Sequence, residues 1–196
     1  MDEKQDFVER ILPHRLGAVE VMGFAIRFRS QWSAPVRMEI LFEGKLSIEG
    51  LSSAFTNPAI ETGIIHCRAL LEFLGLRVDK ANHAKLAQRP SARGDDLLIE
   101  HFANSAGPLP RVTPSEAVAA YKGSPEGAER SLARVIHVAN KGLAHSTVGL
   151  ITDSDDQRLV EIASRGVPSL LMKHFYTPLD LALPPALIKQ RPRDRD

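Results

Sequence analysis

Two N-terminal segments carry apolar residues at helical spacing. A first helix, from about residue 3 to 12, would turn four apolar side chains inward: Phe7, Val8, Ile11 and Leu12. Pro13 has no backbone N–H, so we expect it to interrupt or kink this helix before a second one runs from Leu16 to Phe28.

A third helix has clear start and stop signals. Asn57 suits the N-cap, Pro58 suits the first helical position and Gly75 suits the C-cap. Between them lies an apolar ridge made of Ile60, Ile64, Cys67, Leu71 and Leu74. Arg68 and Glu72 stand one turn apart on its flank and predict an ion pair. If Arg68 instead faced a cleft, it would be a second cation for a ligand site.

Two further segments have no unique pattern. In residues 34–51 a strand-like alternation runs through Val36, Met38, Ile40 and Phe42. One helical face fits the same segment through Met38, Leu41, Phe42 and Lys45, so both alternatives stay open. For residues 77–114 we expect a long irregular segment that contains one short helix, Asp96–Phe102. Asp95 or Asp96 could cap this helix.

The C-terminal half contains three more helix signals. Capping patterns start helices at Thr113-Pro114 and at Ser124-Pro125, and the second should end near His145 or Ser146. A last helix should begin at Asp153 and kink or break at Pro168. The sum predicts an all-α fold, a multi-helix up-down bundle with room for a short irregular or β excursion. We expect one domain over residues 1–188 and a charged flexible tail over 189–196.

The helix that begins near Pro125 has two opposed faces. At about 100° per residue one arc is apolar, through Ala128, Leu132, Val135, Ile136, Ala139 and Leu143. The other arc is basic, through Arg130, Arg134, His137, Lys141 and His145. We call this second set the basic stripe. It could hold phosphate and supply a proton acceptor, or it could be an ordinary solvated helix face.

Composition limits the classes of function. The chain has 25 Lys and Arg against 24 Asp and Glu, so its net charge of +1 attracts neither nucleic acid nor membrane, and a cationic site must be local. The single cysteine, Cys67, cannot form an internal disulfide, and the acidic N-terminus does not resemble a secretory leader. These features predict a cytoplasmic protein. No apolar segment is long enough to span a bilayer, so we expect no membrane partner.

Common catalytic signatures are absent from the chain, among them a P-loop, a dinucleotide-binding glycine fingerprint, a nucleophile elbow and a zinc helix. His137 and His145 could ligate a metal only with further ligands from elsewhere, and Lys141 between them would repel a cation. We therefore expect no metal and no cofactor.

The segment Ala139-Asn140-Lys141-Gly142-Leu143-Ala144-His145, preceded on an earlier helix by Arg68-Ala69-Leu70-Leu71-Glu72-Phe73-Leu74, resembles the HEPN superfamily of helical bundles. The likeness is to branches related to abortive-infection proteins. Members of that family carry an arginine and, after four to six residues, a histidine on a late helix, and active members cleave RNA without metal. The histidine corresponds to His145. The arginine has no counterpart, because Asn140 and Ala139 occupy the nearest matching positions, and Lys141 offers a charge that is shifted by one residue.

The resemblance implies roles for these residues. His145 would be the acid or base near a ribose 2′-OH, Lys141 would stabilise charge on the scissile phosphate and Asn140 would orient one of them. The RNA backbone would be positioned by Arg130, Arg134 and His137. The resemblance also implies a homodimer whose motif helices meet across a shared cleft.

Three hypotheses on function follow. The first is a HEPN-like protein that binds RNA or another phosphate-bearing ligand, with weak or lost metal-independent ribonuclease activity. The second is a non-enzymatic regulatory or defence-related module that binds an acidic protein partner. The third is a small-molecule sensor with a pocket between helices. An apolar pocket away from the basic stripe would favour the third.

Overall fold

The computed structural model describes residues 3–90, 94, 96–121, 123–143 and 154–186. The α-helices are α1 Glu3–Asp6, α2 Leu12–Arg29, α3 Ser53–Phe73, α4 Pro114–Ala119, α5 Pro125–Val138 and α6 Ser154–Leu171. Wider π-helical turns cover Phe7–Ile11, Ala139–Leu143 and Met172–Tyr176, and a 3-10 turn covers Ile99–His101. The strands are β1 Arg37–Phe42, β2 Lys45–Leu51, β3 Leu76–Val78, β4 Leu86–Gln88, β5 Ala103–Asn104 and β6 Gly107–Pro108.

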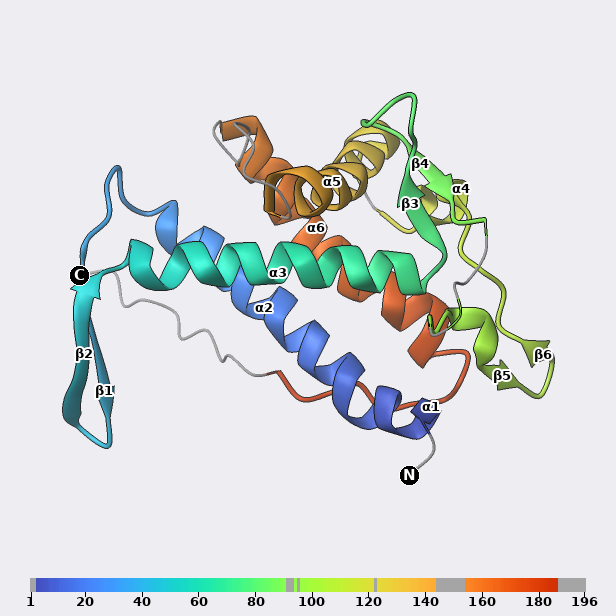
Figure 1. Cartoon of the computed structure of the whole chain (residues 1–196), viewed down its shortest axis with the longest axis horizontal. Helices are drawn as coiled ribbons and strands as arrows, with labels where there is room; N and C mark the ends of the chain where they lie inside the picture. Colours follow the sequence, from blue (N-terminus) through green and yellow to red (C-terminus); the bar gives the residue numbers. More distant parts are fainter. Residues whose placement is uncertain (1–2, 91–93, 95, 122, 144–153, 187–196) are drawn as a thin grey trace.

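The prediction of an all-α up-down bundle is wrong. Helix accounts for 58% of the structure, and a further 14% is strand, arranged in three two-stranded antiparallel sheets. Helices α2, α3, α5 and α6 form the body, and the three hairpins are attached around it (Figure 1). The β3–β4 and β5–β6 hairpins were not predicted because each is short and formed locally, although Leu76 and Leu86 are buried in the core.

The N-terminal helix does not break at Pro13. The chain stays helical from Glu3 to Arg29, and a π-turn at Phe7–Ile11 ends two residues before the proline. In this turn the backbone N–H of Leu12 bonds to the carbonyl of Phe7, five residues back. Phe7 and Leu12 therefore lie one turn apart on the same side. Leu12 is fully buried, and the ring of Phe7 lies 5.0 Å from that of Phe73.

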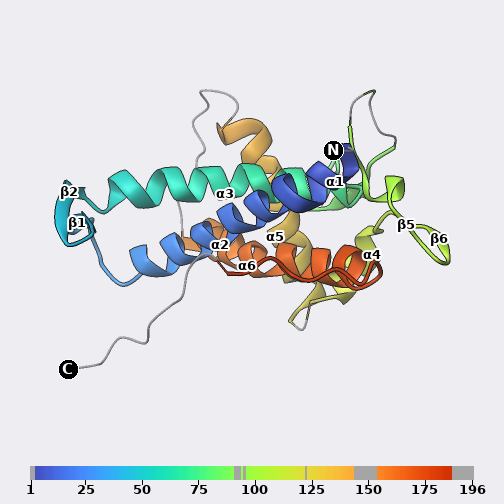
Figure 2. The ribbon, with the colours of Figure 1, turned by 90° about the horizontal axis from the view of Figure 1, so that it is seen from below.

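Helix α3 runs through the middle of the body and packs along α2 (Figures 1 and 2). The predicted apolar ridge is confirmed, because all five of its residues are buried. The predicted start is late: α3 begins at Ser53, so Pro58 lies within the helix, where its ring removes only one backbone hydrogen bond. Gly75 follows the helix with a φ of +92°, as expected for the C-cap.

The ambiguous residues 34–51 form a β-hairpin, so the strand interpretation of that segment is right and the helical one is wrong. β1 and β2 pair antiparallel around a two-residue turn in which Glu43 and Gly44 both have positive φ. The hairpin projects from the end of the body at which α2 ends and α3 begins (Figure 1). We call it the β1–β2 arm.

Residues 77–114 hold more strand and less helix than predicted. β3 pairs with β4 and β5 pairs with β6, while the expected helix Asp96–Phe102 is reduced to the 3-10 turn. Asp96 forms an ion pair with Arg89. The rest of the expected helix is a loop, and the ion pair between Arg111 and Glu100 holds that loop in place.

The start signals of the later helices are confirmed. Thr113 and Glu116 cap α4 reciprocally, and the side chain of Ser124 accepts a hydrogen bond from the backbone of Gly127 in α5. α6 does not break at Pro168 but continues to Leu171 and into the last π-turn. The predicted end of the two-faced helix near His145 and the predicted tail 189–196 lie outside the described residues.

Candidate functional site

The two faces of α5 separate as predicted. Its apolar arc is buried against α3 and α6, including Ala128, Leu132, Val135 and Ile136, and Ala139 continues it. The strong segregation of apolar and polar positions thus dictates how this helix lies on the body. Of the basic stripe, Arg130, Arg134, His137 and Lys141 lie within the described residues, whereas His145 lies outside them.

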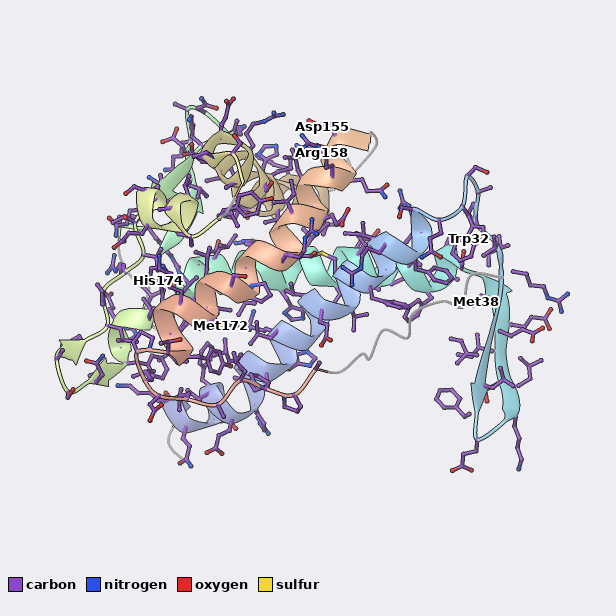
Figure 3. All side chains as sticks on the ribbon, turned by 180° about the vertical axis from the view of Figure 1, so that it is seen from behind. Trp32, Met38, Asp155, Arg158, Met172 and His174 are labelled. Atoms are coloured by element: carbon purple, nitrogen blue, oxygen red, sulfur yellow. The ribbon has the colours of Figure 1, made fainter. Side chains whose placement is uncertain are left out.

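The two arginines of the basic stripe bind carboxylates of α6. Arg130 donates to Asp155 at 3.0 Å, and Arg134 forms a half-buried ion pair with Asp156. Arg158, one turn further along α6, also donates to Asp155, at 3.1 Å; Figure 3 labels both residues in the first turns of that helix. Three guanidinium groups thus meet two carboxylates. The surface keeps an excess positive charge, although these arginines are engaged in joining α5 to α6.

A second histidine, which no sequence pattern singled out, lies against the basic stripe. His83 belongs to the loop between β3 and β4, and its ring centroid is 4.5 Å from that of His137, with the ring planes 33° apart. The loop is internally ordered, because the carboxylate of Asp79 accepts hydrogen bonds from the backbone N–H groups of Ala81 and Asn82.

Glu129 fixes the β3–β4 hairpin on α5. Its carboxylate accepts a hydrogen bond from the ammonium group of Lys85 at 2.8 Å and another from the backbone N–H of Leu86 at 3.1 Å. These contacts place the loop that carries His83 over the helix that carries His137. The imidazole pair is therefore built by tertiary contacts between a loop and a helix that are distant in sequence.

The surroundings of His137 oppose its protonation. Burial lowers the pKa of His137 below its ordinary value, and so do His83, Arg134 and Lys141, while Asp156 acts in the opposite direction. His137 is therefore neutral near pH 7. A neutral imidazole surrounded by cations can accept a proton beside an anionic ligand.

The remaining predicted site residues have different surroundings. Asn140 and Lys141 lie in the π-turn Ala139–Leu143, where Asn140 is half-buried and Lys141 is exposed. Arg68 lies on α3 and donates to Glu72 at 2.9 Å, which confirms the predicted ion pair. Arg68 is not among the charges that act on His137. The structure thus brings Arg134, His137 and Lys141 together and leaves Arg68 in an ion pair of its own.

The opposite face of α5 borders a cavity of about 510 Å³. It lies between α4, α5 and α6, and its walls are mostly small residues: Ala117, Ala120, Gly123, Ala128, Ala163 and Gly166. Tyr121, Ser131 and Arg165 add polar groups. The cavity shares no lining residue with the basic stripe.

No group of three or more potential metal-ligating side chains occurs within the described ranges. Among the helices described, none combines the length and apolar character needed to cross a membrane. No protein-family model, curated protein or solved structure gave a significant match to the chain.

Proposed function

We propose that the surface formed by His83, His137, Arg134 and Lys141 binds RNA or another phosphate-bearing ligand and has weak metal-independent ribonuclease activity. The observation that supports this most is the contact between the two imidazole rings beside an excess of positive charge. The guanidinium and ammonium groups would attract the phosphate backbone, and the neutral His137 would supply the base. HEPN membership and a cytoplasmic location remain part of this proposal.

The chemistry needs no metal. His137 accepts the proton of a ribose 2′-OH, and the 2′-oxygen attacks the adjacent phosphorus. The bond from phosphorus to the 5′-oxygen breaks, and that oxygen receives its proton through His83. The products are a 2′,3′-cyclic phosphate and a 5′-hydroxyl, and Lys141 stabilises the charge that develops on the phosphate. The HEPN resemblance instead assigns the acid or base to His145, oriented by Asn140, and the variants described next distinguish the two assignments.

The experiment incubates the full chain with a mixed RNA pool in EDTA and follows cleavage and binding separately. We expect His137→Gln and His83→Gln to abolish cleavage and Lys141→Ala to weaken binding; His145→Ala tests the HEPN role. His14→Gln is the matched control, because His14 contacts another histidine, His66, with centroids 5.3 Å apart. Salt-sensitive binding without cleavage would reduce the site to a binding module, and the absence of both would overturn the proposal.

The cavity behind α5 favours a second candidate function, the binding of a small molecule. A volume of about 510 Å³ falls within the range of ligand pockets, and the small side chains of the walls leave this space open. A metabolite screen by thermal shift would detect a ligand. Ala120→Leu should remove that shift by filling the cavity, whereas Ala119→Leu, on the exposed side of α4, should preserve it.

A further inference from the structure

The β1–β2 arm exposes an unusual amount of apolar surface. Five of its large apolar side chains are more than half exposed: Leu41, Phe42, Leu46, Ile48 and Leu51. The arm extends away from the helices in Figure 1, and Figure 2 shows it foreshortened beside the start of α3. An isolated two-stranded hairpin is marginal in water and normally needs more strands or a packing partner. Exposed apolar surface of this kind marks an interaction site.

The register separates the arm into two different faces. Ile40 lies opposite Ile48, and a shift in register follows between Ile40 and Leu41. Strand alternation then places Met38, Ile40, Phe42 and Ile48 on one face, which we call the apolar face, whereas Leu41, Leu46 and Leu51 share the other face with charged residues. The other face is charged where the arm joins the body. There the guanidinium group of Arg37 lies 3.6 Å from the carboxylate of Glu39 and 2.6 Å from that of Glu49. Figure 3 labels Met38 on the arm.

The outer edge of β1 has backbone groups ready for another strand. The carbonyl of Val36 accepts the N–H of Ser52, so the residues that bond to β2 alternate as Val36, Met38 and Ile40. The N–H and C=O groups of Arg37 and Glu39 consequently point outward. Within the described part of the chain, β1 pairs with β2 alone.

The charged residues on the outer edge of β1 indicate which strand pairs with it. We propose that β1 pairs antiparallel with β1 of a second copy of this chain, with the two-fold axis at Met38. In that register Arg37 of each copy bonds through its backbone to Glu39 of the other copy, and their opposite charges are adjacent. Centring the pair on residue 37 or 39 would instead oppose two arginines or two glutamates. The sequence Arg37-Met38-Glu39 is thus complementary to itself, as a two-fold interface requires.

An unfavourable pair of like charges within the arm also favours a second copy of the chain as the partner. Glu39 lies directly opposite Glu49 in the hairpin, an arrangement of like charges that destabilises paired strands, and Arg37 contacts both carboxylates. The second copy would bring another Arg37 to Glu39. The result is a four-stranded sheet with one continuous apolar face, contributed equally by both copies.

Charge exchange tests the proposal in the full chain. Light scattering after gel filtration should show a dimer for the natural sequence and a monomer for Arg37→Glu and for Glu39→Arg. The double variant should be dimeric again, because it restores opposite charges across the axis. Glu43→Arg, the same change at the tip, is the control and should remain dimeric. Circular dichroism checks that every variant keeps its helices.

A cysteine cross-link tests the register independently. Met38→Cys would place two thiols on the axis, in a pair whose Cα separation of about 4.5 Å suits a disulfide. We expect a disulfide-linked dimer from Met38→Cys and none from Ser47→Cys, which lies on the far strand. Cys67 contributes no background, because it is fully buried. A monomeric natural chain, or a dimer that resists both charge reversals and fails to cross-link at Met38, would overturn the proposal.

Discussion

At the scale of single residues, burial and neighbouring charge decide how the histidines titrate. Burial is the largest cause of the lowered pKa of His66, His137 and His174, and each of these also lies near a positive charge. The folded chain therefore resists protonation at sites that the unfolded chain protonates near pH 6.5. Because the unfolded state binds more protons, stability must fall as the pH decreases through that value.

We expect the melting temperature to decrease between pH 7.5 and 5.5 and His137→Gln to reduce that decrease. The variant removes one group that the fold keeps neutral. The unfolded state then no longer binds more protons than the folded state at that site. Thermal melts followed by circular dichroism at several pH values would measure the slope. Asn140→Ala, a neighbouring change without a titrating group, should keep the slope of the natural chain. Equal slopes for His137→Gln and the natural chain would contradict the argument.

The residue scale also shows what the sequence could predict of the site. The Arg68–Glu72 pair follows from helical spacing alone, because its partners are one turn apart. The contact between His83 and His137 does not, because a loop and a helix distant in the chain create it. The pairing of Arg130 and Arg134 with α6 was missed for the same reason: spacing indicated their common face but not the carboxylates opposite them.

At the scale of elements, close packing of α2 on α3 depends on Gly63. A Cβ atom at this position would lie 2.2 Å from the Cβ of Met22, which is too close for any side chain. Gly166 in α6 is also a helical glycine, but a side chain has room there. A Cβ atom at this position would lie 3.8 Å from the nearest atom, a methyl carbon of Leu132.

We therefore expect opposite effects of the same substitution in two helices. Gly63→Ala should destabilise the protein by about 1–3 kcal/mol, because α2 and α3 must move apart. Gly166→Ala should be neutral or stabilise it by up to about 1 kcal/mol, because alanine favours a helix more than glycine does. Urea unfolding measures both. A Gly63→Ala variant as stable as the natural chain would show that the two helices are not in such close contact.

The β3–β4 hairpin depends on one side chain for its position on α5. Glu129→Ala should release the hairpin, since it removes the acceptor for the N–H of Leu86 and for Lys85. Hydrogen exchange at Leu86 should become faster, and the pKa of His137 should rise toward its ordinary value as His83 moves away. Glu126→Ala, one turn earlier and exposed, is the control. Unchanged exchange and titration would contradict this role for Glu129.

At the scale of the whole molecule, the helical body and the β1–β2 arm are separable. None of the buried apolar residues of the core comes from residues 36–51, and Val36 and Ser52 lie side by side where the arm joins the body. Apolar periodicity predicted the helices of the body, and capping residues placed the starts of α4 and α5 but not that of α3, because both signals act through neighbours in sequence. The arm was ambiguous because an exposed hairpin has apolar residues on both faces, so its pattern also fits a helix.

Replacing residues 36–51 by a short Gly-Ser linker should leave the body folded. We expect a cooperative melt within a few degrees of that of the natural chain, because the replaced residues add little to the core. The chain without the arm should also be monomeric by light scattering. The comparison is made with Met38→Ser, which keeps the arm but weakens its apolar face. Loss of the cooperative transition on removal of the arm would show that the hairpin contributes to the core.

The π-turn at Phe7–Ile11 has a consequence for how the N-terminal helix tolerates changes in length. Residues five positions apart there occupy the same side, as residues four apart do in an α-helix. Removal of one residue, such as the exposed Glu9, would let this turn close as ordinary α-helix. Phe7 would still lie above Leu12, now at α-helical spacing, and the rest of α2 would keep its rotation relative to α3. A single deletion within this π-turn therefore keeps the buried side chains of α2 facing α3. A deletion further along α2 would instead rotate those side chains away from α3.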